Sequence, residues 1–215
     1  MHLVCFDIDG TLVASAGFDG VLYEEAIREV LGIKLKADVS QYRNVSDSGI
    51  LAEILESVPE AESRARLAKA VQAYFTDRTK QFVAANPNLV REVPGAVQLV
   101  NVLRKKPNVQ VCIATGGWAE TAILKLRAIG LEMDGLAIAT SSDAMNRAEI
   151  IRLAESRATQ ARQFAQRTYF GDGVWDKKAA AQLGYHFVAV GGAVQHNVVF
   201  SDLRDTRAIL AQLGV

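Results

Sequence analysis

The stretch LVCFDIDGTL, residues 3–12, decides the fold of this chain. Its first part, Leu3–Phe6, is a short apolar run with the length and composition of a buried strand. Two carboxylates, Asp7 and Asp9, follow directly, and Gly10 then permits a sharp turn. Because buried charges without partners are costly, such a pair indicates a bound cation or a chemical role. The alternative is that both aspartates cap the turn.

Further apolar runs predict more buried strands, and helical patterns separate them. The predicted strands are Val109–Ala114, Leu136–Ala139, Thr168–Phe170 and His186–Val190, with Val198–Phe200 as an edge strand. The predicted helices between and after them are Gly95–Arg104, Glu120–Ile129, one that includes Ile150–Ala154, Lys177–Leu183 and Asp205–Leu213. This alternation predicts an α/β fold with a Rossmann-like parallel sheet that is covered on both faces.

Residues 17–88 interrupt the alternation of strands and helices. Helical patterns cover Phe18–Leu31, Ser48–Ser57 and Ala61–Val83, and no strand pattern intervenes. A block of this length is too long for an ordinary connection between strands. We therefore expect an inserted all-helical cap subdomain at 17–88 and a core made of 1–16 and 89–215. The joints Val13–Gly17 and Ala85–Val93 would form its hinge, and the small residues of the first suit lid motion.

The composition of the chain excludes some partners. Lys and Arg number 24, as do Asp and Glu, so no long-range field attracts nucleic acid or an anionic membrane. A small anionic substrate needs only a local positive site, and it stays open. The sequence shows neither an apolar membrane span nor a signal peptide, which predicts a cytoplasmic location. Cys5 and Cys112 lie in apolar runs and are predicted to be buried, reduced thiols.

A second acidic cluster, GDGVWD at residues 171–176, follows the predicted strand Thr168–Phe170. Its aspartates, Asp172 and Asp176, are four residues apart, which places them near one another if a helix begins here. The alternative is that either aspartate caps that helix.

Two further candidates lie elsewhere in the chain. Thr115 and Gly116 follow the strand Val109–Ala114, where a hydroxyl and small residues at a helix start can contact phosphate. Threonine also caps helices in many other contexts. Arg147 stands in a polar stretch, and its alternative interpretation is a solvated surface residue.

Asp7, Thr115 and Asp172 each lie just past a predicted strand. Ligands of open parallel sheets bind beyond the carboxyl ends of the strands, so these side chains are expected to converge. Carboxylates with a hydroxyl, and no cluster of His or Cys, favour a hard cation that prefers oxygen. The pattern therefore predicts a Mg²⁺ site.

On these motifs the chain resembles the haloacid dehalogenase superfamily of phosphotransferases. The sequence DIDGT at residues 7–11 matches its first motif, Thr115 its second, and GDGVWD at 171–176 its fourth. The helical insert after the first motif resembles the type 1 cap of this family. The resemblance covers the whole chain, and the first and fourth motifs are its most specific elements.

The third motif of the family is normally a lysine, and here the sequence departs from the pattern. The corresponding position, 32 residues after Thr115 and 25 before Asp172, holds Arg147. Lys125 and Lys177 are the other basic candidates, although their positions fit less well.

The resemblance implies a role for each acidic residue. Asp7 would attack phosphorus and form an aspartyl-phosphate, and Asp9 would protonate the leaving oxygen and then deprotonate a water molecule. Mg²⁺ would be held by the Asp7 carboxylate, the Asp9 backbone carbonyl and Asp172. Asp176 would be a further ligand or a support for the ligands.

The resemblance also assigns the remaining polar residues. Thr115, with Gly116 beside it, would bind the transferring phosphoryl group, and Arg147 would neutralise its charge. The cap segment RNVSDSG, residues 43–49, resembles the substrate-specificity loop of the family.

Arg43, Ser46 and Asp47 of that segment would contact the substrate. Ser46 or Asp47 could equally cap the helix that follows, and the two interpretations are compatible. Trp118 and Trp175 lie close to the motifs and would either line the entrance or pack in the interior.

Together these features predict a Mg²⁺-dependent phosphatase of small phosphorylated metabolites, acting as a monomer or homodimer. Asp9 favours phosphate esters over haloacids, since the dehalogenase branch lacks an acid at that position. One alternative is a phosphomutase that uses the same aspartyl-phosphate. Another is a non-catalytic binding module on the same fold.

Overall fold

The computed structural model describes residues 1–15, 17–159 and 163–215. Its centre is a six-stranded sheet in the order β3-β2-β1-β4-β5-β6, in which every pairing is parallel. The strands are β1 His2–Phe6, β2 Val109–Ala114, β3 Ala137–Ala139, β4 Gln166–Gly171, β5 His186–Val190 and β6 Val199–Phe200. Because β1 lies between β2 and β4, the residues after it are flanked by the ends of two other strands.

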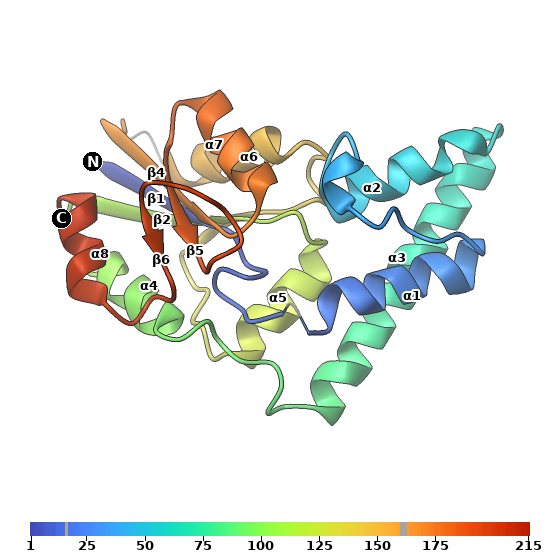
Figure 1. Cartoon of the computed structure of the whole chain (residues 1–215), viewed down its shortest axis with the longest axis horizontal. Helices are drawn as coiled ribbons and strands as arrows, with labels where there is room; N and C mark the ends of the chain where they lie inside the picture. The colour runs from blue at the N-terminus through green and yellow to red at the C-terminus, as the bar shows by residue number, and fades with distance from the viewer. Residues whose placement is uncertain (16, 160–162) are drawn as a thin grey trace.

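Helices cover both faces of this sheet (Figure 1). They are α4 Ala96–Arg104, α5 Ala119–Ala128, α6 Arg147–Thr159, α7 Val174–Leu183 and α8 Thr206–Leu213. Alternate residues of β1 point to opposite faces, so Val4 and Phe6 join the cluster with α4 and α8. Leu3 and Cys5 join the cluster with α6 and α7. The predicted Rossmann-like core is thereby confirmed.

Two helices begin earlier than the sequence pattern predicts. α6 starts at Arg147, where the Asn146 side chain accepts the Ala148 N–H at 3.0 Å. α7 starts at Val174, where the Asp176 carboxylate accepts the Gly173 N–H at 3.0 Å. The first turns of both helices carry polar groups that serve as caps or site residues, so they lack the apolar periodicity on which the prediction depends.

The segment between β1 and α4 is all-helical, as predicted, and lies to one side of the sheet (Figure 1). It contains α1 Asp19–Leu31, α2 Asp47–Ile54, α3 Ala61–Ala85 and the short 3₁₀ turns Val39–Gln41 and Leu55–Ser57. The two joints run side by side: the Ala14 N–H donates to the Arg91 carbonyl and the Val93 N–H to the Leu12 carbonyl, both at 2.9 Å. Ala16, part of the predicted hinge, lies outside the described residues.

Three aromatic side chains connect the helical cap to the core. Phe75 on α3 packs edge-on against Tyr23 on α1 and Trp118 just before α5, with ring centroids 5.6 and 5.7 Å apart. All three are buried. Trp118 therefore serves the packing role that was one of its two predicted interpretations.

Both cysteines are buried and unpaired, as predicted. Cys5 on β1 and Cys112 on β2 are register partners in adjacent strands. Within the described ranges, none of the helices combines the length and the apolar character that crossing a membrane requires.

We predict that Phe75→Ala lowers the free energy of unfolding by about 3–5 kcal/mol, because it leaves a cavity at the junction of cap and core. Val21→Ala, on the exposed side of α1, is the control and is expected to change stability by less than about 0.5 kcal/mol. Chemical denaturation measures both. Equal stability of the two variants would contradict this account of the junction.

Candidate active site

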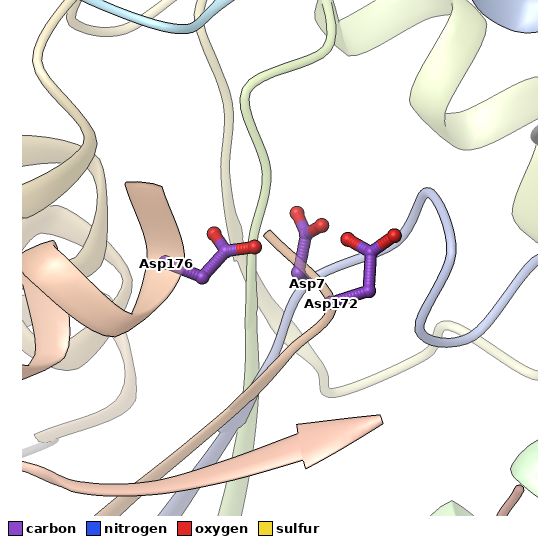
Figure 2. Close-up of side chains that lie close together, drawn as sticks. All are labelled: Asp7, Asp172 and Asp176. Carbon is purple, nitrogen blue, oxygen red and sulfur yellow. The ribbon is translucent and has the colours of Figure 1, made fainter. Parts of the chain in front are cut away.

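Three carboxyl groups meet at the carboxyl edge of the sheet. Asp7 follows β1, Asp172 follows β4, and Asp176 lies in the first turn of α7. Each offers an oxygen, and these oxygens lie within 4.8 Å of one another. Figure 2 shows the Asp7 and Asp172 carboxylates side by side, with the Asp176 carboxylate turned toward Asp7. Residues far apart in the sequence thus converge at one edge, as the parallel strand ends predicted.

Gly10 allows the two acidic loops to approach this closely. Its φ of 78° lies in the left-handed region, and a Cβ at this position would lie 1.9 Å from Asp172 Oδ2. A larger residue would displace the Asp172 carboxylate as well as strain the turn.

Arg147 is the cation of this cluster. Its Nη1 donates to Asp7 Oδ1 at 2.9 Å, and its Nε lies 3.5 Å from Asp176 Oδ1. Burial acts against the charged guanidinium, but Asp176 and Asp7 more than offset it and raise the pKa of Arg147 above its ordinary value. A Cβ on Gly116 would lie 2.6 Å from Arg147 Nη2, so glycine leaves the room that the guanidinium occupies.

The carboxyl groups carry more negative charge than one guanidinium neutralises. Burial, then Asp176, raises the pKa of Asp7 well above its ordinary value, while Arg147 opposes this rise. Burial, Asp176 and Asp9 raise the pKa of Asp172 to about 7. Hard oxygen ligands with surplus negative charge fit a divalent cation such as Mg²⁺.

Thr115 borders the same site from the end of β2. Its side chain is buried, and its Oγ1 accepts the Gly117 N–H at 3.2 Å. Its own N–H donates to the Ala139 carbonyl at 3.1 Å, which fixes the loop against β3. Thr115 is therefore held in place in the cavity that Asp7 also lines.

Lys125 on α5 joins the core to the cap through a buried network. Its Nζ donates to both carboxylate oxygens of Asp9, at 2.6 and 2.7 Å, and to Asp19 Oδ1 at 2.8 Å. Asp19 is the first residue of α1, in the cap. Burial acts against the ammonium, but Asp19 and Asp9 more than offset it and raise the pKa of Lys125. Lys125 thus contacts Asp9, whereas Arg147 contacts Asp7.

A cavity of about 470 Å³ lies between this edge of the sheet and the cap. The candidate residues that line it are Asp7, Asp9, Ser46, Asp47, Thr115, Gly116, Arg147 and Asp172. From the cap, the Asp47 N–H donates to the Gly116 carbonyl at 2.8 Å, and Asp47 Oδ2 accepts the Trp118 N–H at 2.9 Å. Ser46 also caps α2 by accepting the Gly49 N–H at 3.1 Å, which confirms the capping interpretation, while contact of this loop with substrate stays a prediction.

Arg43 is a correction to the predicted substrate contacts, because it does not line this cavity. Its side chain is 64% exposed and forms ion pairs with Glu53 and Glu56 on the outer face of the cap. Lys177, the weaker candidate for the third motif, also lies away from the cavity, and its Nζ donates to the Gln195 carbonyl at 2.7 Å. Trp175 does line the cavity.

Sequence reasoning missed the partnership of Lys125 with Asp19. The position of Asp19 gave a weak indication of a role, because it is an acid in the first turn of a cap helix directly after the joint. Tyr23 and Lys36 of the cap also line the cavity, and no motif marked them.

Fold and site together define a capped α/β enzyme with an aspartate-rich centre. This chain belongs to the haloacid dehalogenase-like hydrolases, since the family model with that description matches residues 1–184.

Solved structures share this fold. A hydrolase from Pseudomonas syringae has a TM-score of 0.74 and 22% identity, with 99% of each chain covered. The β-phosphoglucomutase from Clostridium difficile has a TM-score of 0.72 and 17% identity, with 99% of this chain and 96% of that chain covered. A CbbY variant from Rhodobacter sphaeroides in complex with xylulose-(1,5)bisphosphate has a TM-score of 0.68 and 16% identity, with 94% and 95% covered. No curated protein matches this chain.

The raised pKa values predict how stability depends on pH in the absence of metal. Burial and Asp176 raise the pKa of Asp172 to about 7, and burial and Asp19 raise the pKa of Asp47 to about 8. Both lie above the ordinary value of 3.8, so the folded state binds more protons than the unfolded state. The free energy of unfolding therefore falls as pH rises toward 8, by up to about 1.4 kcal/mol per pH unit for each group.

Thermal unfolding measured between about pH 6.5 and 8.5 tests this trend, since the lowered pKa of His2 acts in the opposite direction only below 6.5. Mg²⁺ at 100 times its Kd is expected to add about 2.7 kcal/mol to the free energy of unfolding. At a fixed Mg²⁺ concentration this gain is expected to grow with pH, because the carboxyl ligands lose their protons. Asp172→Asn is expected to lose most of this gain. Stability that rises with pH in this range would contradict the prediction.

We predict that Lys125→Met destabilises the fold by about 3 kcal/mol, because it leaves Asp9 and Asp19 without their shared cation. Lys177→Met makes the same change at a lysine outside the cavity, and we expect a loss below about 0.5 kcal/mol. Denaturation of both variants in parallel gives the comparison. Equal losses would show that the Lys125 network does not stabilise the junction of core and cap.

Proposed function

We propose that this chain is a magnesium-dependent phosphomonoesterase that hydrolyses small phosphorylated metabolites through an aspartyl-phosphate on Asp7. The observation that carries the proposal is the buried Asp7 carboxylate, which accepts a hydrogen bond from Arg147 at 2.9 Å and lines a cavity bordered on its other side by the cap. The names of its structural neighbours, a phosphoglucomutase and a protein with a bound bisphosphate, support phosphoryl transfer as the chemistry.

In the first step an oxygen of Asp7 attacks phosphorus, and the bond between phosphorus and the ester oxygen breaks. Asp9, two residues further on, gives a proton to that oxygen, so the leaving group departs as a neutral alcohol. In the structure the Lys125 Nζ donates to both oxygens of the Asp9 carboxylate, so Asp9 exchanges one of these contacts for a proton before it acts as the acid. Arg147 and the Thr115 hydroxyl bind the phosphoryl oxygens and offset their charge.

In the second step a water molecule attacks the phosphorus of the aspartyl-phosphate. Asp9 takes the proton of that water, the bond between phosphorus and Asp7 breaks, and inorganic phosphate leaves. Both carboxyl groups return to their starting states. Asp9 therefore serves both steps from one position.

Asp7, the Asp9 backbone carbonyl and Asp172 would hold the Mg²⁺, and Asp176 would support them from behind. Asp176 is fully buried and is held by the Gly173 N–H at 3.0 Å and the Tyr169 hydroxyl at 3.3 Å, which suits a supporting role. The bound ion would supply positive charge to the phosphoryl group and to Asp7.

We also propose the division of the chain into a core, residues 1–16 and 89–215, and a cap, residues 17–88. The paired joints at Leu12–Ala14 and Arg91–Val93 support it, because both connections pass through one narrow point. A cap attached there can open for substrate and close to exclude water.

The experiment that tests the proposed function is phosphate release from p-nitrophenyl phosphate with and without Mg²⁺. Asp7→Asn is expected to lower kcat by roughly 1,000-fold or more, because the amide is a poor nucleophile, while the thermal unfolding curve is preserved. Asp77→Asn, the same change at an exposed residue of α3, is the matched control and is expected to retain full activity.

Full magnesium-dependent turnover by the Asp7→Asn variant would overturn the assignment of the nucleophile. Absence of release from every ester by the unaltered protein would favour a binding module instead.

A further inference from the structure

The two ends of the cavity differ in charge. At the core end, Arg147 stands beside Asp7 and marks the place for the transferring phosphate. At the cap end the lining is mainly apolar and acidic, with Lys36 as its basic residue. The apolar residues there include Leu35, Val39, Val45 and Ile50, and the acidic residues are Asp19, Glu24 and Asp47.

The cap acids are fixed at the cavity wall. Asp47 Oδ2 accepts the Trp118 N–H at 2.9 Å, and Asp19 accepts from Lys125 Nζ at 2.8 Å. Burial, and then the nearby Asp19, raise the pKa of Asp47 to about 8, because both disfavour negative charge at this position. A further anion placed here would meet the same cost of desolvation and the same repulsion by Asp19.

The cations of the cap are already paired. Among the described residues that line the cavity, the basic side chains are Lys36 and Arg147, and Arg147 belongs to the core end. The Lys36 Nζ donates to Glu53 Oε1 at 2.7 Å and to the Gln41 carbonyl at 3.2 Å. It also lies 4.3 Å from the centre of the Tyr42 ring.

Two other basic residues of this region do not reach the cavity. Arg43 pairs with Glu53 and Glu56 on the outer face, and Lys125 is buried with its ammonium between Asp9 and Asp19. A second phosphate at the cap end would bring a charge of about −1.5 to −2. Among the described lining residues it would lie near acidic side chains and would find no unpaired cation. Such like-charge contacts cost several kcal/mol.

This inference rests on the proposed function. We propose that the site hydrolyses esters that carry a single phosphate and whose leaving group is uncharged and partly apolar. It discriminates against bisphosphates and against phosphorylated acids. The carboxyls and hydroxyls at the cap end, such as Asp47 and Tyr23, would accept hydrogen bonds from hydroxyl groups of the leaving alcohol, and the apolar residues would contact its carbon skeleton.

This charge pattern also bears on the choice between hydrolase and mutase. A mutase would return the phosphoryl group from Asp7 to another hydroxyl of a sugar phosphate. The reaction then passes through a bisphosphate, and the cavity must bind its second phosphate. Among the described residues of the cap end, the basic side chain is Lys36, and it is already paired with Glu53. The inference therefore favours transfer to water.

Matched pairs of esters that differ in one anionic group test the proposal. Glucose 1-phosphate is compared with glucose 1,6-bisphosphate, and 2-hydroxyethyl phosphate with 2-phosphoglycolate, all with Mg²⁺ and phosphate release as the readout. We expect kcat/KM to favour the member with the uncharged leaving group by about 10-fold or more in each pair.

A variant pair isolates the charge of the cap. Val39→Lys adds a cation at the cap end, and Val39→Gln adds a polar chain without charge at the same half-buried position. The lysine variant is expected to narrow the preference for 2-hydroxyethyl phosphate over 2-phosphoglycolate by about 5-fold or more, and the glutamine variant to leave it unchanged. Thermal unfolding of both variants checks that they fold, and the unaltered protein tests the preference independently of them.

The outcomes separate this inference from the proposed function. Hydrolysis of 2-phosphoglycolate or the bisphosphate as fast as that of their uncharged partners overturns the inference and leaves the phosphatase intact. No release from any ester, including p-nitrophenyl phosphate, overturns both.

Discussion

The candidate active site depends on the burial of negative charge at the end of the central strand. Asp7, Asp172 and Asp176 bring carboxylate oxygens within 4.8 Å of one another, and Asp7 and Asp176 are almost fully buried. One guanidinium, that of Arg147, balances part of this charge and leaves a demand for further positive charge. The position of β1 between two parallel neighbours creates the convergence, and glycines at 10 and 116 leave the space it needs.

A second group of paired charges connects the site to the cap. Lys125 is buried on α5 and divides its hydrogen bonds between Asp9 of the core and Asp19 of α1. The residue proposed as acid and base is thereby tied to the element that covers the site. Aromatic packing of Phe75 and Tyr23 on Trp118 holds the same junction by apolar contact. The position of the cap and the geometry of Asp9 are therefore coupled through Lys125 and Asp19, which lie outside the sequence motifs of the family.

Charge is also what divides the cavity into two parts. The core end has Arg147 beside Asp7, whereas at the cap end Lys36 is paired with Glu53 and Asp19 is paired with Lys125, and Glu24 and Asp47 also line the cavity there. Under the proposed function, one physical requirement, an anion's need for a nearby cation, would account both for the position of the phosphate and for the preferred leaving groups. The cap residues, and not the sheet, supply the second half of the cavity, so proteins with this fold can differ in substrate through their caps.

The sequence by itself determined the parallel sheet, the helical insert and the acidic edge. Strand patterns follow from local apolar periodicity, and parallel strand ends must meet, so the convergence of Asp7 with Asp172 was predictable. The contact of Arg147 with Asp7 agrees with a prediction from motif spacing, but only the tertiary structure shows the contact. The same holds for Arg43, which turns outward to Glu53 and Glu56, and for Lys125, whose partners come from core and cap. Side-chain pairing between distant segments depends on how the cap docks on the sheet, and no local pattern in the chain encodes that docking.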